Sequence, residues 1–351
     1  MQRGRIHWRR CIGMALNFVT IGEVLLRLTT PRSERLTQAR QFDAIYGGTE
    51  CNVAVALEQF GVEPALISRI PDNDIGQACV NYIRQYGVDT SLVVRSGDRL
   101  GLYYLEIGAS VRPSAVVYDR ARSAMSEIEP GMVDWPSALA GRDWFHFSGI
   151  TCAISEKSTA TVAAGCQAAK AAGMTVSTDF NYRSALWSPE EGAKRLGPLM
   201  QYVDVAIGSA RDPILGIMLG MSGNIEPDDR SADAYRPFVE KAVSKYGFAK
   251  MALTVRDIHS SDHNSWQGVY FDGSEIALSR RHELEIVDRV GGGDGFAAGA
   301  IWGVMNGWNP QQVADFATAS GAIAHTIHGD FNLASEAEVL AAASGSSDVR
   351  R

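Results

Sequence analysis

The stretch VDRVGGGDGFAAG, Val287–Gly299, places three consecutive glycines and one acid directly before a run of small and apolar residues. Consecutive glycines let backbone N–H groups approach a ligand closely, and they can adopt positive φ angles. The run that follows is typical of a helix with small residues on one side. A glycine loop that leads into a helix N-terminus forms an anion cradle suited to phosphate.

The acid in this cradle, Asp294, cannot serve to bind phosphate, because like charges repel. A carboxylate beside a transferring phosphoryl group can instead take the proton from the attacking hydroxyl. The stretch therefore predicts Asp294 as a catalytic base, with Gly291, Gly292 and Gly293 as donors to the developing charge. Taken alone, the stretch is equally consistent with a flexible turn in which Asp294 caps the helix.

A dinucleotide-binding loop is a second alternative, because Gly293, Gly295 and Ala298 match the pattern G-x-G-x-x-A. That fingerprint opens the first βαβ unit of its fold, whereas this match comes last in the chain. It also needs an acid at the end of the next strand, and the nearest candidate, Asp315, lies in a helical pattern. The sequence has no G-x-x-x-x-G-K-[ST] loop, which excludes P-loop phosphotransfer.

Short β-branched and aromatic runs alternate along the chain with helical patterns, several of which stop at glycine. The predicted strands are Phe18–Gly22, Ala65–Ile70, Trp144–Ile150, Thr175–Phe180, Val203–Gly208 and Lys250–Val255. The predicted helices are Asn52–Phe60, Gly76–Tyr86, Glu156–Ala172, Pro189–Tyr202 and Ala232–Tyr246. The alternation predicts an α/β fold with a mostly parallel central sheet covered by helices on both faces. Ligands of such sheets bind beyond the carboxyl ends of the strands.

Two segments, at about 23–47 and 98–122, interrupt the alternation. The first has strand-like pieces but no helix, and the second has the pattern of a hairpin whose faces mix apolar and polar residues. We interpret both as a small β-sheet lid, since lids close over substrates that must be kept from water. A surface hairpin on the main sheet is the plain alternative.

The composition is that of an ordinary globular protein, with 46% hydrophobic and 21% charged residues. A net charge of −7 gives no support to nucleic acid as a partner, and no segment has the apolar length of a membrane span. The five cysteines are odd in number and widely spaced, which favours reduced thiols and a cytoplasmic location. We expect a disordered basic tail at 1–13, one domain at 14–342 and a disordered tail at 343–351.

The glycine stretch resembles the C-terminal signature of the ribokinase, or PfkB, family of sugar kinases. YGGTECNVAVALEQFGVEPALISRIPDNDIGQ, Tyr46–Gln77, resembles the family's N-terminal signature: two glycines, an asparagine, an apolar helix ending in glycine, and a later D-x-x-G. The two motifs occur in the right order, separated by most of the chain. The resemblance implies a three-layer α/β/α sandwich with a β lid, and ATP, Mg²⁺ and often a monovalent cation such as K⁺ as cofactors.

Within the family, GLYYLEIGASVRPSAVVYDRARSA, DFNYRSALWSPEEG and IHGDFNLASEAE resemble the kinases of 2-keto-3-deoxygluconate. This resemblance implies a sugar-acid site made by Gly48, Asn52, Tyr103, Tyr118, Arg120, Arg183 and Asp330. Arginine binds a carboxylate through two parallel hydrogen bonds, so Arg120 and Arg183 are predicted to bind that of the sugar acid. The local alternatives are surface salt bridges for the arginines, turns at Gly48 and Asp330, packing of the tyrosines and a helix cap at Asn52.

For ATP, the resemblance implies contacts with Ser209, Thr254, Arg256, Gly293 and Thr318. Ser209 stands where the family usually has the Asn of N-x-x-E, and the chain reads GSARD there, which weakens a phosphate or Mg²⁺ assignment to this loop. Thr254 and Arg256 match the loop after the next strand, which in the family usually reads T-x-G. Asp288 matches a monovalent-cation position; its alternative is an ordinary acid at a strand end.

Three functions compete: an ATP-dependent sugar-acid kinase, the same fold acting on a neutral sugar such as fructose or on a nucleoside, and a non-catalytic sugar-binding regulator. The intact Asp294 argues against the regulator, and the two arginines argue against a neutral substrate. We expect phosphorylation of 2-keto-3-deoxygluconate to its 6-phosphate, with the galactonate-derived epimer left open because it carries the same carboxylate. We also expect a homo-oligomer, a dimer through the lid, with neither nucleic acid nor a membrane as a partner.

Overall fold

The computed structural model describes residues 17–221, 227 and 230–346, and its strands form one large sheet and one small sheet. The large sheet contains β1 (Asn17–Ile21), β4 (Glu63–Ile70), β5 (Val93–Arg95), β8 (Trp144–Ser148), β9 (Thr175–Asp179), β10 (Val205–Ser209), β11 (Lys250–Ile258), β12 (His263–Phe271), β13 (Ile276–Leu278) and β14 (His282–Glu285). The small sheet contains β2 (Leu25–Thr29), β3 (Asp43–Gly47), β6 (Gly101–Glu106) and β7 (Ala115–Asp119).

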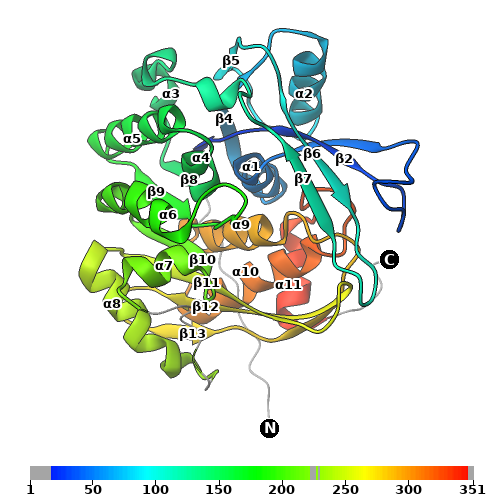
Figure 1. The fold of residues 1–351 in the computed structure, drawn as a ribbon. Helices are drawn as coiled ribbons and strands as arrows, with labels where there is room; N and C mark the ends of the chain where they lie inside the picture. The colour runs from blue at the N-terminus through cyan, green and yellow to red at the C-terminus, as the bar shows by residue number, and fades with distance from the viewer. Residues whose placement is uncertain (1–16, 222–226, 228–229, 347–351) are drawn as a thin grey trace.

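The helices of the described residues divide into two layers that cover the two faces of the large sheet (Figure 1). One layer consists of α1 (Thr49–Gln59), α2 (Asp74–Arg84), α9 (Gly292–Met305), α10 (Pro310–Ala324) and α11 (Glu336–Ser344). The other consists of α3 (Trp135–Leu139), α4 (Gly149–Ile154), α5 (Glu156–Ala171), α6 (Pro189–Leu196), α7 (Pro213–Met218) and α8 (Arg236–Tyr246). Short 3₁₀ helices are η1 (Met125–Glu127), η2 (Pro130–Met132), η3 (Gly197–Tyr202) and η4 (Ala232–Tyr235).

The large sheet has the order β13-β12-β11-β10-β9-β8-β1-β4-β5, with β14 also paired to β12. From β5 to β11 every pairing is parallel, and β12, β13 and β14 add antiparallel pairings. Side chains on β10 alternate between the layers: Val205 and Ile207 pack with one helix layer and Ala206 with the other. The predicted α/β/α sandwich is confirmed, and the six predicted strands correspond to β1, β4, β8, β9, β10 and β11.

Two of the predicted helices are each divided at a proline. The helix expected at Pro189–Tyr202 is α6 followed by η3, which carries Pro198 in its first turn. The helix expected at Ala232–Tyr246 is η4 followed by α8, which begins at Arg236 next to Pro237. Proline fits the first turn of a helix, where its missing N–H has no partner to lose, so it marks the start of a new helix.

The small sheet has the order β3-β2-β6-β7, and its strands lie within the two segments that interrupt the α/β alternation. Leu25, Tyr103 and Leu105 form an apolar cluster on its inner face. The tip of the hairpin between β6 and β7 contacts the β11–β12 connection, because Ser261 Oγ donates to the Arg112 carbonyl (2.6 Å) and Ser110 N donates to Asp262 Oδ2 (3.2 Å). The small sheet thus lies over the large one, in the place expected for a lid.

The predicted boundaries at the chain ends are only partly covered by the structure. The expected basic tail at 1–13 lies outside the described residues, as do residues 347–351. The domain end expected at 342 falls inside α11, which continues to Ser344 and ends at Gly345 in the left-handed conformation (φ 78°).

Among the described helices, none combines the length and apolarity needed to cross a bilayer.

Candidate active site

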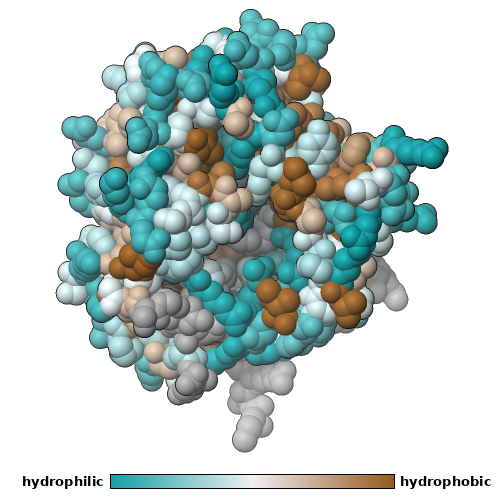
Figure 2. Space-filling view, viewed as in Figure 1, coloured by the Kyte–Doolittle hydropathy of each residue, from teal (hydrophilic) through white to brown (hydrophobic). Residues whose placement is uncertain are grey.

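A cavity of about 620 Å³ lies between the small sheet and the carboxyl ends of the parallel strands. Its recess opens on the face of the molecule shown in Figure 2. The residues predicted for the site that lie on its wall are Gly48, Asn52, Tyr103, Tyr118, Arg120, Arg183, Ser209, Thr254, Arg256, Asp288, Gly291, Gly293, Asp294 and Asp330. The structure therefore brings together residues from both signatures, from the second lid segment and from the strand ends, and Glu23 and Leu25 of the first lid segment lie on the same wall.

Two predicted residues lie behind this wall. Thr318 is fully buried in α10, and its hydroxyl donates to the Ala314 carbonyl (2.8 Å), so its side chain does not face the cavity, where a contact with ATP was expected. Gly292 packs against His325, whose ring carbon Cε1 lies 2.1 Å from where a Cβ of residue 292 would be. Gly292 can still contribute its backbone N–H, which belongs to the first turn of α9.

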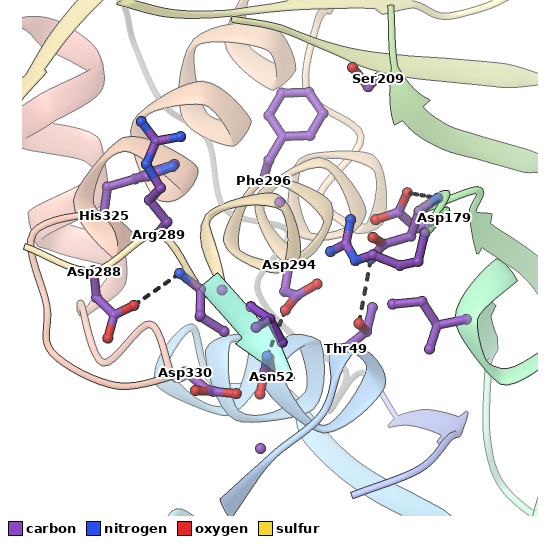
Figure 3. A pocket seen from close by; sticks show the side chains of 18 of the residues that line it. Thr49, Asn52, Asp179, Ser209, Asp288, Arg289, Asp294, Phe296, His325 and Asp330 are labelled. Atoms are coloured by element: carbon purple, nitrogen blue, oxygen red, sulfur yellow. Dashed lines mark hydrogen bonds between the residues drawn. The ribbon is translucent and has the colours of Figure 1, made fainter. Parts of the chain in front are cut away.

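Asp294 lies in the first turn of α9 with its carboxylate on the cavity wall (Figure 3). Its Oδ2 accepts a hydrogen bond from Asn52 Nδ2 of α1 (2.6 Å). Burial raises the pKa of Asp294 to about 7, while the Asn52 hydrogen bond and the charge of Arg183 lower it. A carboxylate with a pKa close to neutrality can accept a proton readily while a substantial fraction of it is ionised at neutral pH.

The GGGD loop is held in a single shape by its surroundings. Gly291 caps α9 with φ 83°, a left-handed conformation that favours glycine. A Cβ at Gly291 would lie 2.1 Å from the Asp330 carbonyl oxygen, whereas a Cβ at Gly293 would meet nothing within 4 Å. The first N–H groups of a helix have no partner within the helix, so those of Gly292, Gly293 and Asp294 can serve an anion in the cavity.

We expect Gly291→Ala to destabilise the protein and Gly293→Ala to leave its stability unchanged. The left-handed conformation alone costs a residue with a Cβ roughly 1–2 kcal/mol, and the contact with the Asp330 carbonyl adds to that cost. Thermal and urea unfolding of both variants measure the difference. Equal stability of the two variants would contradict the cramped position of Gly291.

The two arginines of the predicted carboxylate site differ in their surroundings. Arg120 donates through Nε (2.9 Å) and Nη2 to Glu23 Oε2, and it lies over the ring of Tyr118 at 5.6 Å. Arg183 makes one described hydrogen bond, from Nη1 to the Tyr182 carbonyl (3.2 Å). Arg183 is therefore the arginine with more donors open to the cavity, while Arg120 is already ion-paired.

Arg27 of β2 was not predicted from the sequence, yet it contacts two of the predicted residues. Its Nη1 donates to Asp330 Oδ1 (2.7 Å), and its Nη2 donates to Asp288 Oδ2. Asp330 also accepts from the Tyr103 hydroxyl (3.0 Å). The sequence offered one indication of this position. Alternate side chains of a strand face the same side, so Arg27 and Thr29 face inward with Leu25.

Asp179 and Asp212 are two further acids on the cavity wall that sequence reasoning missed. Asp179 ends β9; burial and the charges of Asp294 and Asp212 raise its pKa to about 8. Its Oδ1 accepts from Asn181 N (3.1 Å), and no partner of its Oδ2 is found among the described contacts. Asp212 caps α7 by accepting from Ile214 N (2.9 Å), and burial raises its pKa. Asp179 lies at the carboxyl end of its strand and Asp212 follows β10, at positions where ligands bind.

The cavity region near β10 and β11 is rich in positive charge. Arg256 of β11 is partly buried and has no hydrogen-bond partner among the described contacts. Burial and the charges of Arg289, Arg183 and Arg211 lower the pKa of Arg256 to about 10. Arg256 and its three neighbouring arginines repel one another, so this region favours a polyanionic ligand. Ser209 and Thr254 lie on the same part of the wall, paired in register across β10 and β11.

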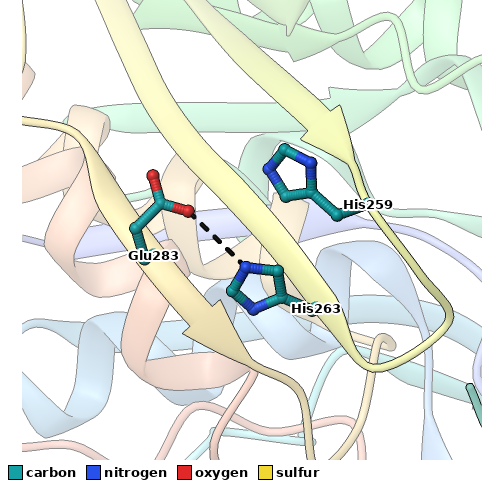
Figure 4. Close-up of side chains that lie close together, drawn as sticks. All are labelled: His259, His263 and Glu283. Atoms are coloured by element: carbon teal, nitrogen blue, oxygen red, sulfur yellow. Dashed lines mark ion pairs between the residues drawn. The ribbon is translucent and has the colours of Figure 1, made fainter.

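One group of potential metal ligands lies outside the cavity among the described residues. His259, His263 and Glu283 come together on the β11–β12 hairpin and β14 (Figure 4). Glu283 is already bound by Arg281 Nε (2.9 Å) and by the Ser265 hydroxyl (2.7 Å). Because its charge is neutralised by Arg281 and all three ligands are exposed, we assign no metal to this group.

Comparisons with known proteins agree with this geometry. The model of the pfkB family carbohydrate kinases matches residues 15–247. A solved 2-dehydro-3-deoxygluconokinase from Thermotoga maritima is similar over 95% of this chain and 99% of its own, with 41% identity and a TM-score of 0.90. A 2-dehydro-3-deoxygalactonokinase from Haloferax volcanii is 30% identical over 93% of this chain and 96% of its own length.

A more distant solved structure shares the fold. It is a protein assigned as ribokinase II from Escherichia coli, in complex with ATP and Mg²⁺. It is similar over 93% of this chain and 98% of its own, with 19% identity and a TM-score of 0.75. The three-layer sandwich with its small sheet is thus a ribokinase-like fold, as the two signatures predicted.

Proposed function

The chain belongs to the PfkB family of carbohydrate kinases, and on this premise we propose that it transfers the γ-phosphoryl group of ATP to the 6-hydroxyl of a 2-keto-3-deoxy sugar acid, with Asp294 as the base. The observation that carries the proposal is the buried Asp294 carboxylate, with its pKa near 7, on the same wall as the open N–H groups of the glycine loop. Proton acceptance and anion binding are thus available at one place, as phosphoryl transfer requires.

We assign ATP to the basic region near β10 and β11. Arg256 and its neighbouring arginines match a triphosphate in charge, and Ser209, Thr254 and Gly293 lie on the adjoining wall. The E. coli protein of the same fold binds ATP and Mg²⁺. Asp179 and Asp212 are the residues here that would hold hydrated Mg²⁺, because Asp179 keeps an oxygen without a described partner. When bound, Mg²⁺ neutralises charge on the phosphate oxygens.

We assign the sugar acid to the region beneath the small sheet. Arg183 offers its guanidinium to the substrate carboxylate, with Arg120 held alongside by Glu23. Gly48, Asn52, Tyr103, Tyr118 and Asp330 supply the remaining wall. The Thermotoga relative, a kinase of the gluconate-derived acid, is 41% identical. The Haloferax relative, a kinase of the galactonate-derived acid, is 30% identical. We therefore propose the gluconate-derived acid as the first candidate substrate and its epimer as the second.

The reaction then proceeds through groups of this chain. The small sheet covers the sugar and excludes water, which would otherwise compete as the phosphoryl acceptor. Asp294 accepts the proton of the 6-hydroxyl group while the oxygen of that hydroxyl bonds to the γ-phosphorus. At the same time the bond between the γ-phosphorus and the bridging oxygen breaks, and that oxygen leaves with ADP. The N–H groups at the start of α9 bind the charge that develops on the transferred group.

Exposed apolar residues of the lid and its flanks, Phe42, Val111, Val116 and Val117, support the further proposal of a dimer formed through the lid.

The test of this function is ADP release over a panel of sugar acids and neutral sugars. We expect the highest kcat/KM with 2-keto-3-deoxygluconate or its galactonate-derived epimer, and a much lower value with fructose or ribose. A preference for a neutral sugar or a nucleoside would contradict the proposed substrate. Phosphorylation of none of the compounds would contradict the proposed activity.

The pKa of Asp294 gives a pH dependence with a definite sign. The base must be ionised, so kcat/KM should fall about tenfold per pH unit below pH 7 and reach a plateau above it. The charged groups that face Asp294 are Arg183, Asp330, Glu50 and Asp179. The hydrogen bond from Asn52 lowers the pKa of Asp294. The variant Asn52→Ala lacks this bond, so the midpoint of its pH profile should lie at higher pH than that of the wild type.

The measurement is kcat/KM between pH 5 and 9 with the coupling enzymes in excess. A profile that is flat from pH 5 to 8 would rule out Asp294 as the titrating base. A midpoint that Asn52→Ala leaves unmoved would show that the titrating group is not the one bonded to Asn52.

A further inference from the structure

Two buried carboxylates lie next to the glycine loop. Asp288 precedes the loop in the chain, and Asp330 lies against Gly291; their side chains are 1% and 3% exposed. They are linked, because the Gly329 N–H donates to Asp288 Oδ2 (3.2 Å). Two acids at this depth require a compensating positive charge, since an unpaired buried charge is costly.

The compensating charge is the guanidinium of Arg27, whose side chain is 0% exposed. Nη1 and Nη2 each contact one of the two acids, and Nε donates to Thr29 Oγ1 (2.6 Å). All three nitrogens are therefore bonded, and the charge is held in one place. The pKa of Arg27 is raised above its ordinary value by Asp330 and Asp288, against the lowering effect of burial.

The surroundings of Asp288 do not fit the monovalent cation that the family resemblance implies at this position. Its Oδ1 accepts from Val290 N (3.1 Å), and its Oδ2 accepts from Gly329 N and from Arg27. Hard cations bind through several oxygen ligands. A K⁺ ion at Asp288 would have to share Oδ2 with a guanidinium, and the two positive charges would repel each other.

We propose that Arg27 is the built-in cation of this site, so that phosphoryl transfer by this chain needs no monovalent metal ion, and that Arg27 positions the glycine loop from the lid. The inference rests on the proposed function at Asp294. Arg27 fixes the side chain of Asp330, and the backbone carbonyl of Asp330 in turn packs against Gly291. Because Arg27 lies on β2, the positive charge is supplied by the lid.

The first experiment is cation exchange on the wild-type enzyme. KCl is replaced by NaCl or choline chloride at constant ionic strength and saturating MgATP, and kcat, KM and Tm are measured. We expect kcat and KM to agree within about twofold in the three salts, and Tm to be the same. Saturable activation by K⁺ of fivefold or more, or a rise in Tm specific to K⁺, would overturn the proposal. The Tm arm needs no sugar, so it decides the cation question even if the proposed substrate is wrong.

The second experiment tests the charge with Arg27→Met, which keeps much of the side-chain length, and Arg27→Lys, which keeps the charge. We expect Arg27→Met to lower kcat at least tenfold and to move the midpoint of the pH profile upward, because Asp330 is then uncompensated close to Asp294. Arg27→Lys should keep the wild-type midpoint. The control is Arg112→Met, which removes a lid arginine paired with Glu106, away from the glycine loop, and should change neither quantity.

The outcomes of the second experiment separate an electrostatic role from a purely structural one. A folded Arg27→Met enzyme with the wild-type midpoint would show that Arg27 only supports the lid, and it would overturn the positioning role. A folded enzyme with kcat within threefold of the wild type would do the same. If Arg27→Met does not fold, the cation exchange on the wild type still decides whether the site needs a metal ion.

Discussion

Asp294→Asn is expected to lower kcat by a factor on the order of 10² to 10⁴, the usual contribution of a general base. The substitution removes the proton acceptor with little change in shape. The amide oxygen can still accept the hydrogen bond from Asn52 Nδ2, so the contact between α1 and α9 is kept. Sugar binding should therefore be largely intact, and the loss should lie in kcat.

The measurements are kcat by ADP release and sugar affinity by calorimetry. The matched control is Asp315→Asn, a buried acid of α10 that accepts from Arg280 N (2.8 Å) and lies outside the cavity wall. It tests whether exchanging a buried carboxylate for an amide has a general effect on turnover. Near wild-type turnover in Asp294→Asn would refute the base assignment.

Arg183→Ala is expected to lower kcat/KM for the sugar acid about ten- to a hundredfold, since hydrogen bonds to charged groups are worth roughly 1.5–3 kcal/mol. The loss should be selective, because a neutral ketose such as fructose has no carboxylate to bind. Arg120→Ala should act in the same direction, but it also removes the ion-pair partner of Glu23, so its effect mixes substrate binding with lid stability. Arg183→Lys should rescue poorly, since a point charge replaces a planar fork.

The design must separate binding from the pH effect, because Arg183 also lowers the pKa of Asp294. The ratio of kcat/KM for 2-keto-3-deoxygluconate to that for fructose is therefore measured on the high-pH plateau, with ATP affinity measured alongside. Arg195→Ala, which removes an arginine paired with Glu191 along α6, is the control. If both substrates lose equally, Arg183 supports the fold or the base, and the sugar-acid assignment loses its main physical support.

Local patterns in the sequence determined the fold class and the centre of the site. Strand and helix periods are local, so the alternation predicted the parallel sheet and its two helix layers, and the glycine run predicted the anion cradle at α9. Asp294 could be singled out because its proposed role follows from its position at a helix N-terminus. The interruptions of the alternation were sufficient to predict the small sheet.

The tertiary structure decided which charges meet, and this was not readable from the sequence. Arg27 pairs with Asp288 across 261 residues and with Asp330 across 303, and Arg120 pairs with Glu23 across 97. The energy of such a pair depends on the distance between the charges and on their burial, and the sequence around each residue indicates neither. For the same reason the resemblance assigned Thr318 to ATP, whereas its hydroxyl donates to the Ala314 carbonyl of its own helix. The pKa of Asp294 is likewise raised by burial and by the charges of Asp330 and Glu50, which only the folded chain brings together.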